Sequence, residues 1–420
     1  MDFALDARTE ELREELLAFM DSYVYPAEPV FAEQLSQLEN RWAWDSVPVL
    51  AELRAEARKR GLWNLFLPGG QGGPGDRPPG EQYGAGLTSL QYAPLAEITG
   101  RAIHLAPAVL NCSAPDTGNM EVLAMFGSDE QKERWLRPLL AGEIRSSFAM
   151  TEPDVASSDA TNVATSIVRD GDEYVINGRK TFITGAMNPN ALIFIVMGKT
   201  DTGAERHRQQ SMILVPRDAP GLVIKRGMHI LGYDDHEHGG HAELELVDVR
   251  VPAGNLIAGE GDGFAIAQAR LGPGRIHHCM RSIGVAERAI ELMCARASQR
   301  VAFGKPLSEQ GVIREWIAES RVRVEQLRLL VLKTAWLIDV RGTKGAHTEI
   351  QSIKIATPEA VQWIVDKAIQ VHGAAGLSQD FPLAAAFAGI RTLRFADGPD
   401  EVHKNALARA ELRRQAARKQ

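Results

Sequence analysis

Cysteine is scarce in this chain, and no segment is long and apolar enough to cross a bilayer. The 420 residues include three cysteines, Cys112, Cys279 and Cys294, which lie far apart. An odd, scattered set argues against a disulfide framework or a thiolate metal site and suits a reducing compartment. The chain has no run of about 18 apolar residues, and its N-terminus lacks the apolar stretch of a secretory signal. We therefore expect a cytoplasmic protein with no integral membrane segment.

An excess of positive charge is also missing. Lysine and arginine total 47 against 54 aspartates and glutamates, and the formal net charge is -7. This balance excludes a basic surface for nucleic acid. The short basic run at residues 413–419 is interpreted as a solvated helix end. The sequence contains no G-x-S-x-G nucleophile motif, no internal repeat and no low-complexity tract.

The composition is that of a globular protein with two or three domains. Hydrophobic residues make up 45% and charged residues 24% of the chain, and 420 residues can bury a large core. Patterning divides the chain into a helical part at 1–147, a β part at 148–257 and a second helical part at 258–420. The predicted order is therefore helical, β, helical.

The first part has apolar residues at helical spacing. Residues 10–23 and 49–60 each place leucines on one face of a helix, and Ser128 is a predicted helix start. A glycine- and proline-rich loop separates these segments. Its Gly70–Gly75 stretch matches G-x-G-x-x-G, but Pro68 and Pro74 exclude the flanking strand and helix that a dinucleotide site needs.

The middle part contains short runs of β-forming residues with turn signals between them. Gly171-Asp172 and Asn177-Gly178 are the turn signals, and the second is a strong hairpin cue. Short strands without intervening helices indicate an antiparallel barrel or sandwich. The predicted runs are 167–168, 174–176, 181–184, 192–196, 211–215, 221–225 and 242–247.

The last part returns to helical patterning. Residues 317–340 form a long amphipathic stretch, and Thr357-Pro358-Glu359 is predicted to open another helix. Gly272-Pro273-Gly274 is interpreted as a helix start that precedes Arg275, His277 and His278. Because helix N-termini favour anions, these side chains are candidates for binding an anionic group. Cys279 falls in the apolar pattern and is predicted to be a core residue.

A histidine-rich segment is a candidate metal site. His236, His238 and His241 occur near Asp234 and Asp235, but their spacing is irregular and two glycines interrupt them. We favour a loop between strands, with a polar lining of a binding cleft as the second interpretation, and we predict no metal.

An acidic turn near the C-terminus is the main catalytic candidate. The segment ADGPDEVH spans residues 396–403 and follows a long helical region. Asp, Gly and Pro are ordinary turn residues, so Asp397 has two interpretations: a helix connection, or a base fixed at a Gly-Pro turn.

Five motifs in order make the chain resemble the acyl-CoA dehydrogenase family. They are FAMTEP at 148–153, NGRKTFIT at 177–184, RVAFGK at 300–305, QVHGAAG at 370–376 and the Asp397 turn. TEPDVASSD at 151–159 and GPGRIHH at 272–278 look most like the branch that holds the dehydrogenase domains of acyl-CoA dehydrogenase family members ten and eleven and bacterial relatives. The resemblance implies an α+β multidomain fold: an N-terminal helical domain, a middle antiparallel β-barrel or sandwich, and a C-terminal four-helix bundle.

The resemblance also implies the chemistry. An FAD-dependent acyl-CoA dehydrogenase converts an acyl-CoA thioester to the trans-2-enoyl-CoA in fatty acid β-oxidation, with hydride transfer to flavin N5. Asp397 stands where the family usually has a catalytic Glu, and we expect burial to raise its pKa and basicity. By analogy, a flavin ribityl hydroxyl and the base's own N–H stabilise the enolate oxygen.

The remaining site residues are carried over from the resemblance. The implied FAD-binding residues are Phe148, Met150, Thr151, Ser157, Ser158, Phe182, Ile183, Thr184, Arg300, Phe303, Gln370, Gly373, Ala374, Pro399 and Glu401. The implied substrate-binding residues are Ser158, Arg275, His277, His278 and Gly398. Phe182 replaces a frequent Trp, Ala374 replaces a glycine, and Gly311 replaces a Gln that contacts adenine.

Substrate, partners and alternatives follow from the same branch. Its substrates derive from 4-hydroxyacyl-CoA, so we expect a polar or anionic acyl substituent near His277, His278 and His241. Electron-transfer flavoprotein is the implied electron acceptor, and Arg300 and Phe303 would reach the FAD of a second subunit in a homodimer or homotetramer. An acyl-CoA oxidase and a non-catalytic flavin- or CoA-binding homologue are the alternatives.

Overall fold

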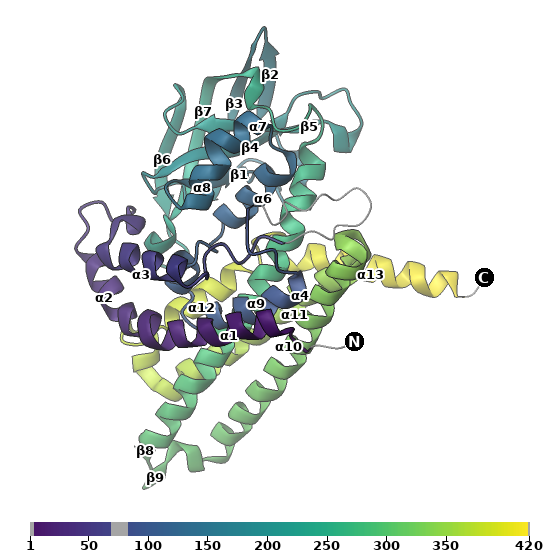
Figure 1. Ribbon diagram of the computed structural model, residues 1–420. Helices are drawn as coiled ribbons and strands as arrows, with labels where there is room; N and C mark the ends of the chain where they lie inside the picture. The colour runs from purple at the N-terminus through teal and green to yellow at the C-terminus, as the bar shows by residue number, and fades with distance from the viewer. Residues whose placement is uncertain (1–3, 69–82, 419–420) are drawn as a thin grey trace.

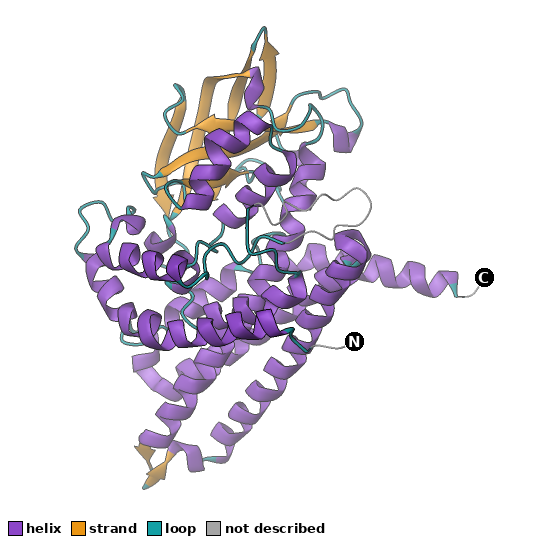
Figure 2. Cartoon of the chain, viewed as in Figure 1, coloured by secondary structure: helices purple, strands orange, loops and turns teal. Residues whose placement is uncertain are grey.

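The computed structural model describes residues 4–68 and 83–418, in which a β-sheet lies between two helical parts of the sequence. Figure 1 shows the sheet at one end of the molecule and the long helices α10 and α11 toward the other, with α9 running between the two. Figure 2 shows the same division by secondary structure. The predicted Gly70–Gly75 loop lies outside the described residues.

The N-terminal domain is helical, as predicted. Its helices are α1 (Ala7–Phe19), α2 (Tyr25–Ser36), α3 (Pro48–Lys59), α4 (Ser89–Gly100), α5 (Ala106–Val109), α6 (Asp116–Phe126), α7 (Asp129–Gln131) and α8 (Arg137–Ala141). The predicted start at Ser128 is confirmed, because its side chain accepts the N–H of Gln131 while the Gln131 side chain accepts the N–H of Ser128. This reciprocal capping satisfies two amides at the helix start.

The middle domain is a curled sheet of seven strands. They are β1 (Arg145–Ala149), β2 (Ser166–Asp170), β3 (Glu173–Thr184), β4 (Ala191–Lys199), β5 (Gln210–Pro216), β6 (Leu222–Met228) and β7 (His241–Pro252). The order is β1-β4-β2-β3-β7-β6, with β5 also paired to β4. Most pairs are antiparallel, but β1 runs parallel to β4, and β2 meets β4 in parallel at one residue pair.

Of the two predicted turns of the β domain, the first is confirmed and the second is wrong. Gly171 and Asp172 form the two-residue turn between β2 and β3, whose last pair is Asp170 with Glu173. Asn177-Gly178 lies inside β3, where the register with β7 shifts. A Cβ on Gly178 would lie 2.3 Å from the Thr165 hydroxyl oxygen. The glycine therefore serves a close approach within a continuous strand and not a turn.

The C-terminal domain is helical, as predicted. Its elements are α9 (Gly263–Gln299), β8 (Val301–Ala302), β9 (Lys305–Pro306), α10 (Gly311–Gly345), α11 (His347–His372), α12 (Leu383–Thr392) and α13 (Asp400–Ala417). The long helices α9, α10 and α11 pack on one another, α4 packs against α9 and α10, and α12 and α13 pack against α11. Helix α13 projects from the body of the chain (Figure 1).

Two predicted helix starts are wrong because burial overrides local propensity. Helix α9 continues through Gly272-Pro273-Gly274, and its apolar stripe stays buried on both sides, at Ile266 and Ile276. Helix α11 likewise contains Pro358 in its interior, where Thr357 is fully buried. Packing of an apolar face outweighs the local cost of Gly and Pro. Residues 275–278 are therefore not at a helix N-terminus.

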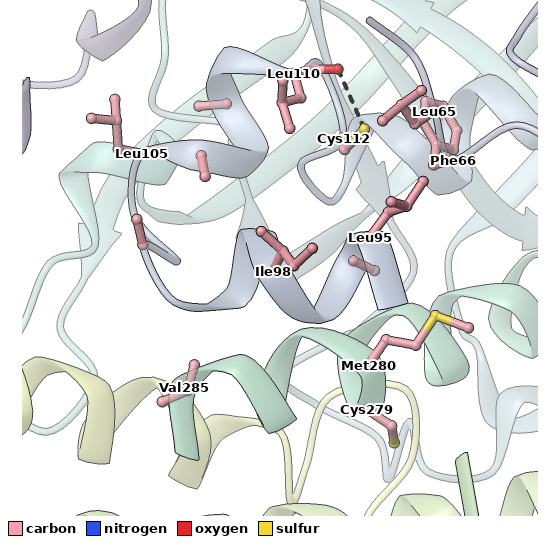
Figure 3. Packing of buried hydrophobic residues seen from close by; sticks show 14 of the residues in the cluster. Leu65, Phe66, Leu95, Ile98, Leu105, Leu110, Cys112, Cys279, Met280 and Val285 are labelled. Atoms are coloured by element: carbon pink, nitrogen blue, oxygen red, sulfur yellow. Dashed lines mark hydrogen bonds between the residues drawn. The ribbon is translucent and has the colours of Figure 1, made fainter. Parts of the chain in front are cut away.

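A glycine pair sets the position of α9. A Cβ on Gly100 of α4 would lie 1.9 Å from the Arg281 carbonyl oxygen, and a Cβ on Gly284 of α9 would lie 2.0 Å from that of Glu97. The two helix backbones can therefore cross in contact. Figure 3 shows the apolar packing at this crossing, where Leu95 and Ile98 of α4 lie near Met280. Cys279 is buried in the same core, as predicted, and all three cysteines are free.

A buried ion pair joins two strands and the segment that follows a third. Lys180 of β3 is fully buried, and its Nζ lies 2.8 Å from Oε1 of Glu152. The same ammonium donates to the carbonyls of Met150, after β1, and Met197 of β4 at 3.1 and 2.6 Å. Burial lowers the pKa of Lys180 to about 8, against the opposing effect of Glu152. Every donor of this ammonium has an acceptor, as a buried charge requires.

No helix within the described ranges has the length and apolar character needed to span a membrane. This finding agrees with the absence of long apolar runs in the sequence.

Candidate active site

Asp397 lies on a tight connection between α12 and α13. Its φ is 58° and that of Gly398 is 107°, so two successive residues adopt left-handed backbone conformations. A non-glycine residue in that region is uncommon and is often found at functional sites. The Asp397 side chain is 14% exposed. The carboxylate therefore points into the protein, as a catalytic residue would.

Neighbouring side chains hold the backbone of this connection. Arg275 Nε of α9 donates to the Asp397 carbonyl at 3.0 Å. A ring nitrogen of His403 lies 3.1 Å from the Gly398 carbonyl oxygen, and Gln351 of α11 bonds the other ring nitrogen. Arg394, ahead of the turn, donates to Asp400 at 2.7 Å. Three elements thus fix the turn, and the Asp397 carboxylate is left free of hydrogen bonds from described residues.

Basic side chains surround the carboxylate. His278 Nε2 lies 3.6 Å from Asp397 Oδ2, which is too long for a hydrogen bond. Burial acts to raise the pKa of Asp397, but His278, Arg270, Arg275 and Lys354 outweigh burial and hold this pKa below its ordinary value. The expectation that burial raises the pKa of the base is therefore wrong. Nearby positive charge dominates desolvation here.

His278 itself is neutral near pH 7. Burial lowers its pKa to about 4, although Asp397 acts in the opposite direction. The lasting positive charges near the carboxylate are therefore the two guanidinium groups, Arg270 and Arg275, and the Lys354 ammonium. Burial also lowers the pKa of each of these three groups.

Arg270 links the Asp397 turn to the β domain and was not identified from the sequence. Its guanidinium carbon lies 4.0 Å from the ring centroid of Phe148 on β1, a cation–π distance. Its Nε donates to Asn119 Oδ1 of α6 at 3.1 Å, and the residue is 8% exposed. Its partners come from segments far away in the sequence, so no local pattern could reveal it.

Glu121 of α6 is a second buried acid in this region. Burial raises its pKa to about 8, against the opposing charges of Arg270 and Arg281. Its Oε1 has no hydrogen-bond partner among the described residues. Glu121 is therefore mainly protonated near pH 7. No pattern in the sequence indicates Glu121, because a single Glu in a helix is not distinctive.

His277 does not lie beside Asp397. Its ring packs edge-on against Tyr92 and Phe66, with centroids 5.1 and 6.5 Å apart. Burial lowers its pKa to about 3. Of the two predicted histidines, the structure brings His278 to the carboxylate and places His277 in the helical core.

The predicted FAD-binding residues of the β domain gather at one rim of the sheet. The Thr181 N–H donates to the Thr151 carbonyl at 2.9 Å, joining the segment after β1 to β3. Phe182 is 50% exposed and has a φ of 54°. Thr184 bonds His241 of β7 at 3.0 Å. The rim thus combines a bare aromatic ring with two threonines.

The other residues of this group differ in accessibility. Ile183 is 1% exposed, so only its backbone can meet a ligand. The Met150 carbonyl is occupied by Lys180. Ser157 Oγ accepts the Glu152 N–H at 2.9 Å, whereas Ser158 is exposed. Ser158 therefore has the free hydroxyl of the pair.

The remaining predicted residues lie elsewhere on the chain. Arg300 follows α9, and Phe303, which is 99% exposed, occupies the β8–β9 hairpin. Arg300 is 25 residues beyond Arg275, roughly 37 Å along a helix, so one chain does not bring the two together. Exposed positions after the Asp397 turn and at the end of α11 complete the set: Glu401, Gln370, Gly373 and Ala374, with the half-buried Pro399.

The histidine segment forms paired contacts. His236 Nδ1 lies 3.0 Å from Asp234, and Asp235 lies 2.7 Å from His238 and 3.0 Å from His241. Within the described ranges, no group of three or more potential ligands is arranged to hold a metal ion. Each histidine in the segment already has a carboxylate partner.

Comparison with known proteins covers nearly the whole chain. Family models for the N-terminal, middle and C-terminal domains of acyl-CoA dehydrogenases match residues 7–143, 147–249 and 261–412. The Mycobacterium tuberculosis protein named probable acyl-CoA dehydrogenase FadE2 is 51% identical over 99% of this chain and 98% of its own length. Human acyl-CoA dehydrogenase family member 11 is 52% identical over 99% of this chain. This chain spans about half of that relative, 52% of its length.

Solved structures show the same fold. A protein from Mycobacterium abscessus, assigned to the acyl-CoA dehydrogenases, is 50% identical to this chain, with a TM-score of 0.92. The match covers 98% of this chain and 100% of the M. abscessus chain. Butyryl-CoA dehydrogenase from Megasphaera elsdenii is 25% identical with a TM-score of 0.78, over 98% and 100% of the two chains. The helical, β, helical arrangement is thus shared along the full length.

Proposed function

This chain belongs to the acyl-CoA dehydrogenase family as an FAD-dependent oxidoreductase of CH–CH groups, and we propose that Asp397 is the base of its α,β-dehydrogenation. The reaction converts an acyl-CoA thioester to the trans-2-enoyl-CoA. The observation that carries the proposal is an inward-facing carboxylate, 14% exposed, ringed by cations on a turn fixed by α9 and α11.

The rim of the sheet fits a flat, partly polar ring. Phe182 leaves half of its surface bare, and Thr151 and Thr184 supply hydroxyl groups beside it. Arg270 connects this rim to Asp397 through Phe148. FAD bound here would accept the hydride that leaves the substrate's β carbon. We propose the rim positions Phe148, Thr151, Phe182 and Thr184 as its contacts.

The charges around Asp397 suit proton abstraction from a thioester. A carboxylate with a lowered pKa is ionised throughout the neutral range, ready to accept a proton. As the α proton moves to Asp397, negative charge moves to the thioester oxygen. The charges of Arg270, Arg275 and Lys354, which already act on the Asp397 carboxylate, would stabilise that negative charge after it leaves the carboxylate.

The backbone of the base contributes a donor. Among the described residues, the Asp397 N–H donates to no protein acceptor. Arg275 fixes the carbonyl of the same residue, so the orientation of the turn is set before substrate binds. A preorganised N–H of this kind can bond the developing enolate oxygen.

Anaerobic titration of the purified holoenzyme with acyl-CoA tests the proposal. We expect bleaching of the flavin absorbance with the wild type and none with Asp397→Asn, which keeps the shape of the side chain. Asp380→Asn is the matched control, because Asp380 is an exposed acid of the same domain. Bleaching by Asp397→Asn at the wild-type rate would refute the role of this base.

We further propose a substrate with a polar or anionic substituent near C4 of the acyl group. Arg270, Arg281 and Lys354 are buried and Arg275 is half-buried; the carboxylates of Asp397, Asp116 and Asp400 act against these charges, and Glu121 is mainly protonated. The net positive charge that remains favours an anionic ligand group. The test compares kcat/KM for plain, 4-hydroxy and 4-phospho acyl-CoAs of one length. Equal values for all three would refute this substrate class.

The electron acceptor and the assembly are part of the proposal. Electron-transfer flavoprotein would reoxidise the cofactor; rapid peroxide formation in air would instead favour the acyl-CoA oxidase alternative. Phe303 and Val301 are 99% and 61% exposed on the hairpin, which supports a contact with a second copy of the chain. Light scattering of wild type and Phe303→Ser would test whether this hairpin joins a homodimer or homotetramer.

A further inference from the structure

Thr184, His241 and Asp235 form a chain of hydrogen-bonding groups at the rim of the sheet. Thr184 and His241 are directly opposite in the β3–β7 register. Thr184 Oγ1 lies 3.0 Å from His241 Nδ1, and His241 Nε2 lies 3.0 Å from Asp235 Oδ2. The imidazole therefore spans the distance between a hydroxyl and a carboxylate, with one nitrogen to each.

The carboxylate end of this chain is held firmly. The backbone carbonyl of Asp235 accepts the N–H groups of His238 and Gly240, both at 3.0 Å. The second carboxylate oxygen of the Asp235 side chain, Oδ1, lies 2.7 Å from His238 Nδ1. Burial acts to raise the pKa of Asp235, but His238 and His241 hold it well below the ordinary value. Asp235 is thus a carboxylate that accepts from two rings.

Residues of the N-terminal domain cover the same loop. A Cβ on Gly240 would lie 2.4 Å from the Trp42 ring, so the indole packs directly on the loop backbone. His104 Nδ1 lies 3.0 Å from Glu237 Oε1, and Arg41 pairs with Asp234. Three contacts from another domain therefore fix the loop that positions Asp235.

The donor and acceptor roles follow from this arrangement. A carboxylate can only accept, so the His241 nitrogen that faces Asp235, Nε2, carries a proton. When Nε2 holds the only proton of the ring, Nδ1 has a lone pair and accepts the Thr184 hydroxyl proton. With that proton committed, the Thr184 oxygen can offer only lone pairs to any ligand at the rim.

We propose that His241, oriented by Asp235, is a positioning residue that makes the Thr184 hydroxyl a hydrogen-bond acceptor toward the flavin. The inference rests on the proposed function, in which Thr184 contacts FAD. A two-electron reduced flavin carries an N–H donor that the oxidised ring lacks. An acceptor oxygen at Thr184 therefore stabilises the reduced form, and the His241–Asp235 pair raises the reduction potential of the bound cofactor.

Spectroelectrochemical titration of the holoenzyme tests this role with three substitutions. His241→Ala removes both contacts. His241→Asn places an amide oxygen near the position of Nδ1 and keeps an acceptor for Thr184, whereas His241→Gln reaches toward Asp235 and loses the Thr184 contact. For His241→Ala and His241→Gln we expect the equilibrium for reduction to fall about tenfold, or about 30 mV for a two-electron couple. We expect His241→Asn to stay near the wild-type potential.

A double-mutant cycle separates the relay from general effects on the fold. In a Thr184→Val background, His241→Ala should produce no further shift, because the group that it orients is gone. Selective ¹⁵N labelling of histidine in the wild-type holoenzyme should show His241 as the Nε2–H tautomer. A proton on His241 Nδ1, in the neutral or the doubly protonated ring, or equal potentials for the wild type and all three His241 variants, would overturn the inference.

The same experiments distinguish the two proposals. If the protein binds no FAD, or if its bound flavin is not bleached by acyl-CoA, the proposed function fails first. If FAD binds and is bleached normally while its reduction potential does not change in the His241 variants, only the positioning role is refuted.

Discussion

The Nε of Arg275 donates to the backbone carbonyl of Asp397 across 3.0 Å, so a helix more than 100 residues earlier in the chain holds the turn that carries the proposed base. The contact is to backbone and leaves the Asp397 carboxylate free. A side chain that takes and releases a proton has to stay free in this way, while its position is fixed elsewhere.

Arg275→Lys is predicted to lower kcat more than it changes KM. Lysine keeps the charge but lacks the planar donor that reaches the Asp397 carbonyl. Loss of about one hydrogen bond, roughly 1.4 kcal/mol, corresponds to about tenfold in rate. Stopped-flow measurement of flavin reduction checks the value. Arg288→Lys on the same helix, where Arg288 pairs with Glu28, should change little.

Gly274→Ala is predicted to impair the reaction, whereas Gly272→Ala is predicted to be nearly silent. Both residues lie inside α9, so either alanine gains up to about 1 kcal/mol of helix propensity. A Cβ at 274 would lie 3.4 Å from Asp397 Oδ2, and one at 272 would lie 3.4 Å from Thr343 Cγ2. Only the first methyl shields the carboxylate and narrows its space. Equal reduction rates for the two variants would contradict a base at this position.

Glu121→Gln is predicted to stabilise the protein at pH 7. The pKa of Glu121 is raised from 4.5 to about 8 by burial, so the folded state binds a proton that the unfolded state releases above about pH 4.5. Stability therefore falls as pH rises from there to about 8. At pH 7 the amide, which needs no proton, should raise the free energy of unfolding by about 3 kcal/mol. Urea denaturation measures this gain, and Gln at the exposed Glu359 should give none.

His238→Gln is predicted to remove a loss of stability at alkaline pH. Burial acts to lower the pKa of His238, but Asp235 and Glu237 raise it from 6.5 to about 9. The stabilisation is complete below pH 6.5 and disappears as the pH rises through 9; its full size is about 3 kcal/mol. Unfolding measured from pH 6 to 10 should show a flatter curve for the variant. A curve as flat for His229→Gln, at an exposed histidine, would contradict the assignment to His238.

Local signals in the sequence predicted features that local structure determines. Ser128 caps its helix because the partner amide is three residues away, and the Asp397 turn consists of residues with strong turn preferences. The helix start predicted at Gly272-Pro273-Gly274 is wrong because burial of α9 overrides the local preference of these three residues. The hairpin turn predicted at Asn177-Gly178 is wrong because Gly178 serves instead to leave space for the Thr165 side chain.

The electrostatics of the site could not be predicted in this way. Arg270 acquires its role from Phe148, Asn119 and the Asp397 turn, which meet only in the folded chain. The direction of the Asp397 pKa shift depends on the sum of these charges, which no single segment contains. Placement of His277 in the core, and of His278 beside the base, depends on how α9 is rotated against α4.

The contacts of the Lys180 ammonium affect the order in which parts of the protein unfold. It bonds the segment after β1, a loop carboxylate and β4 at once, and pulling any one of these away would strand a charge in an apolar interior. The edge of the sheet that presents Thr151 and Phe182 should therefore separate as a unit. Amine-directed reagents should modify Lys180 after the exposed lysines, and only when that whole edge has opened.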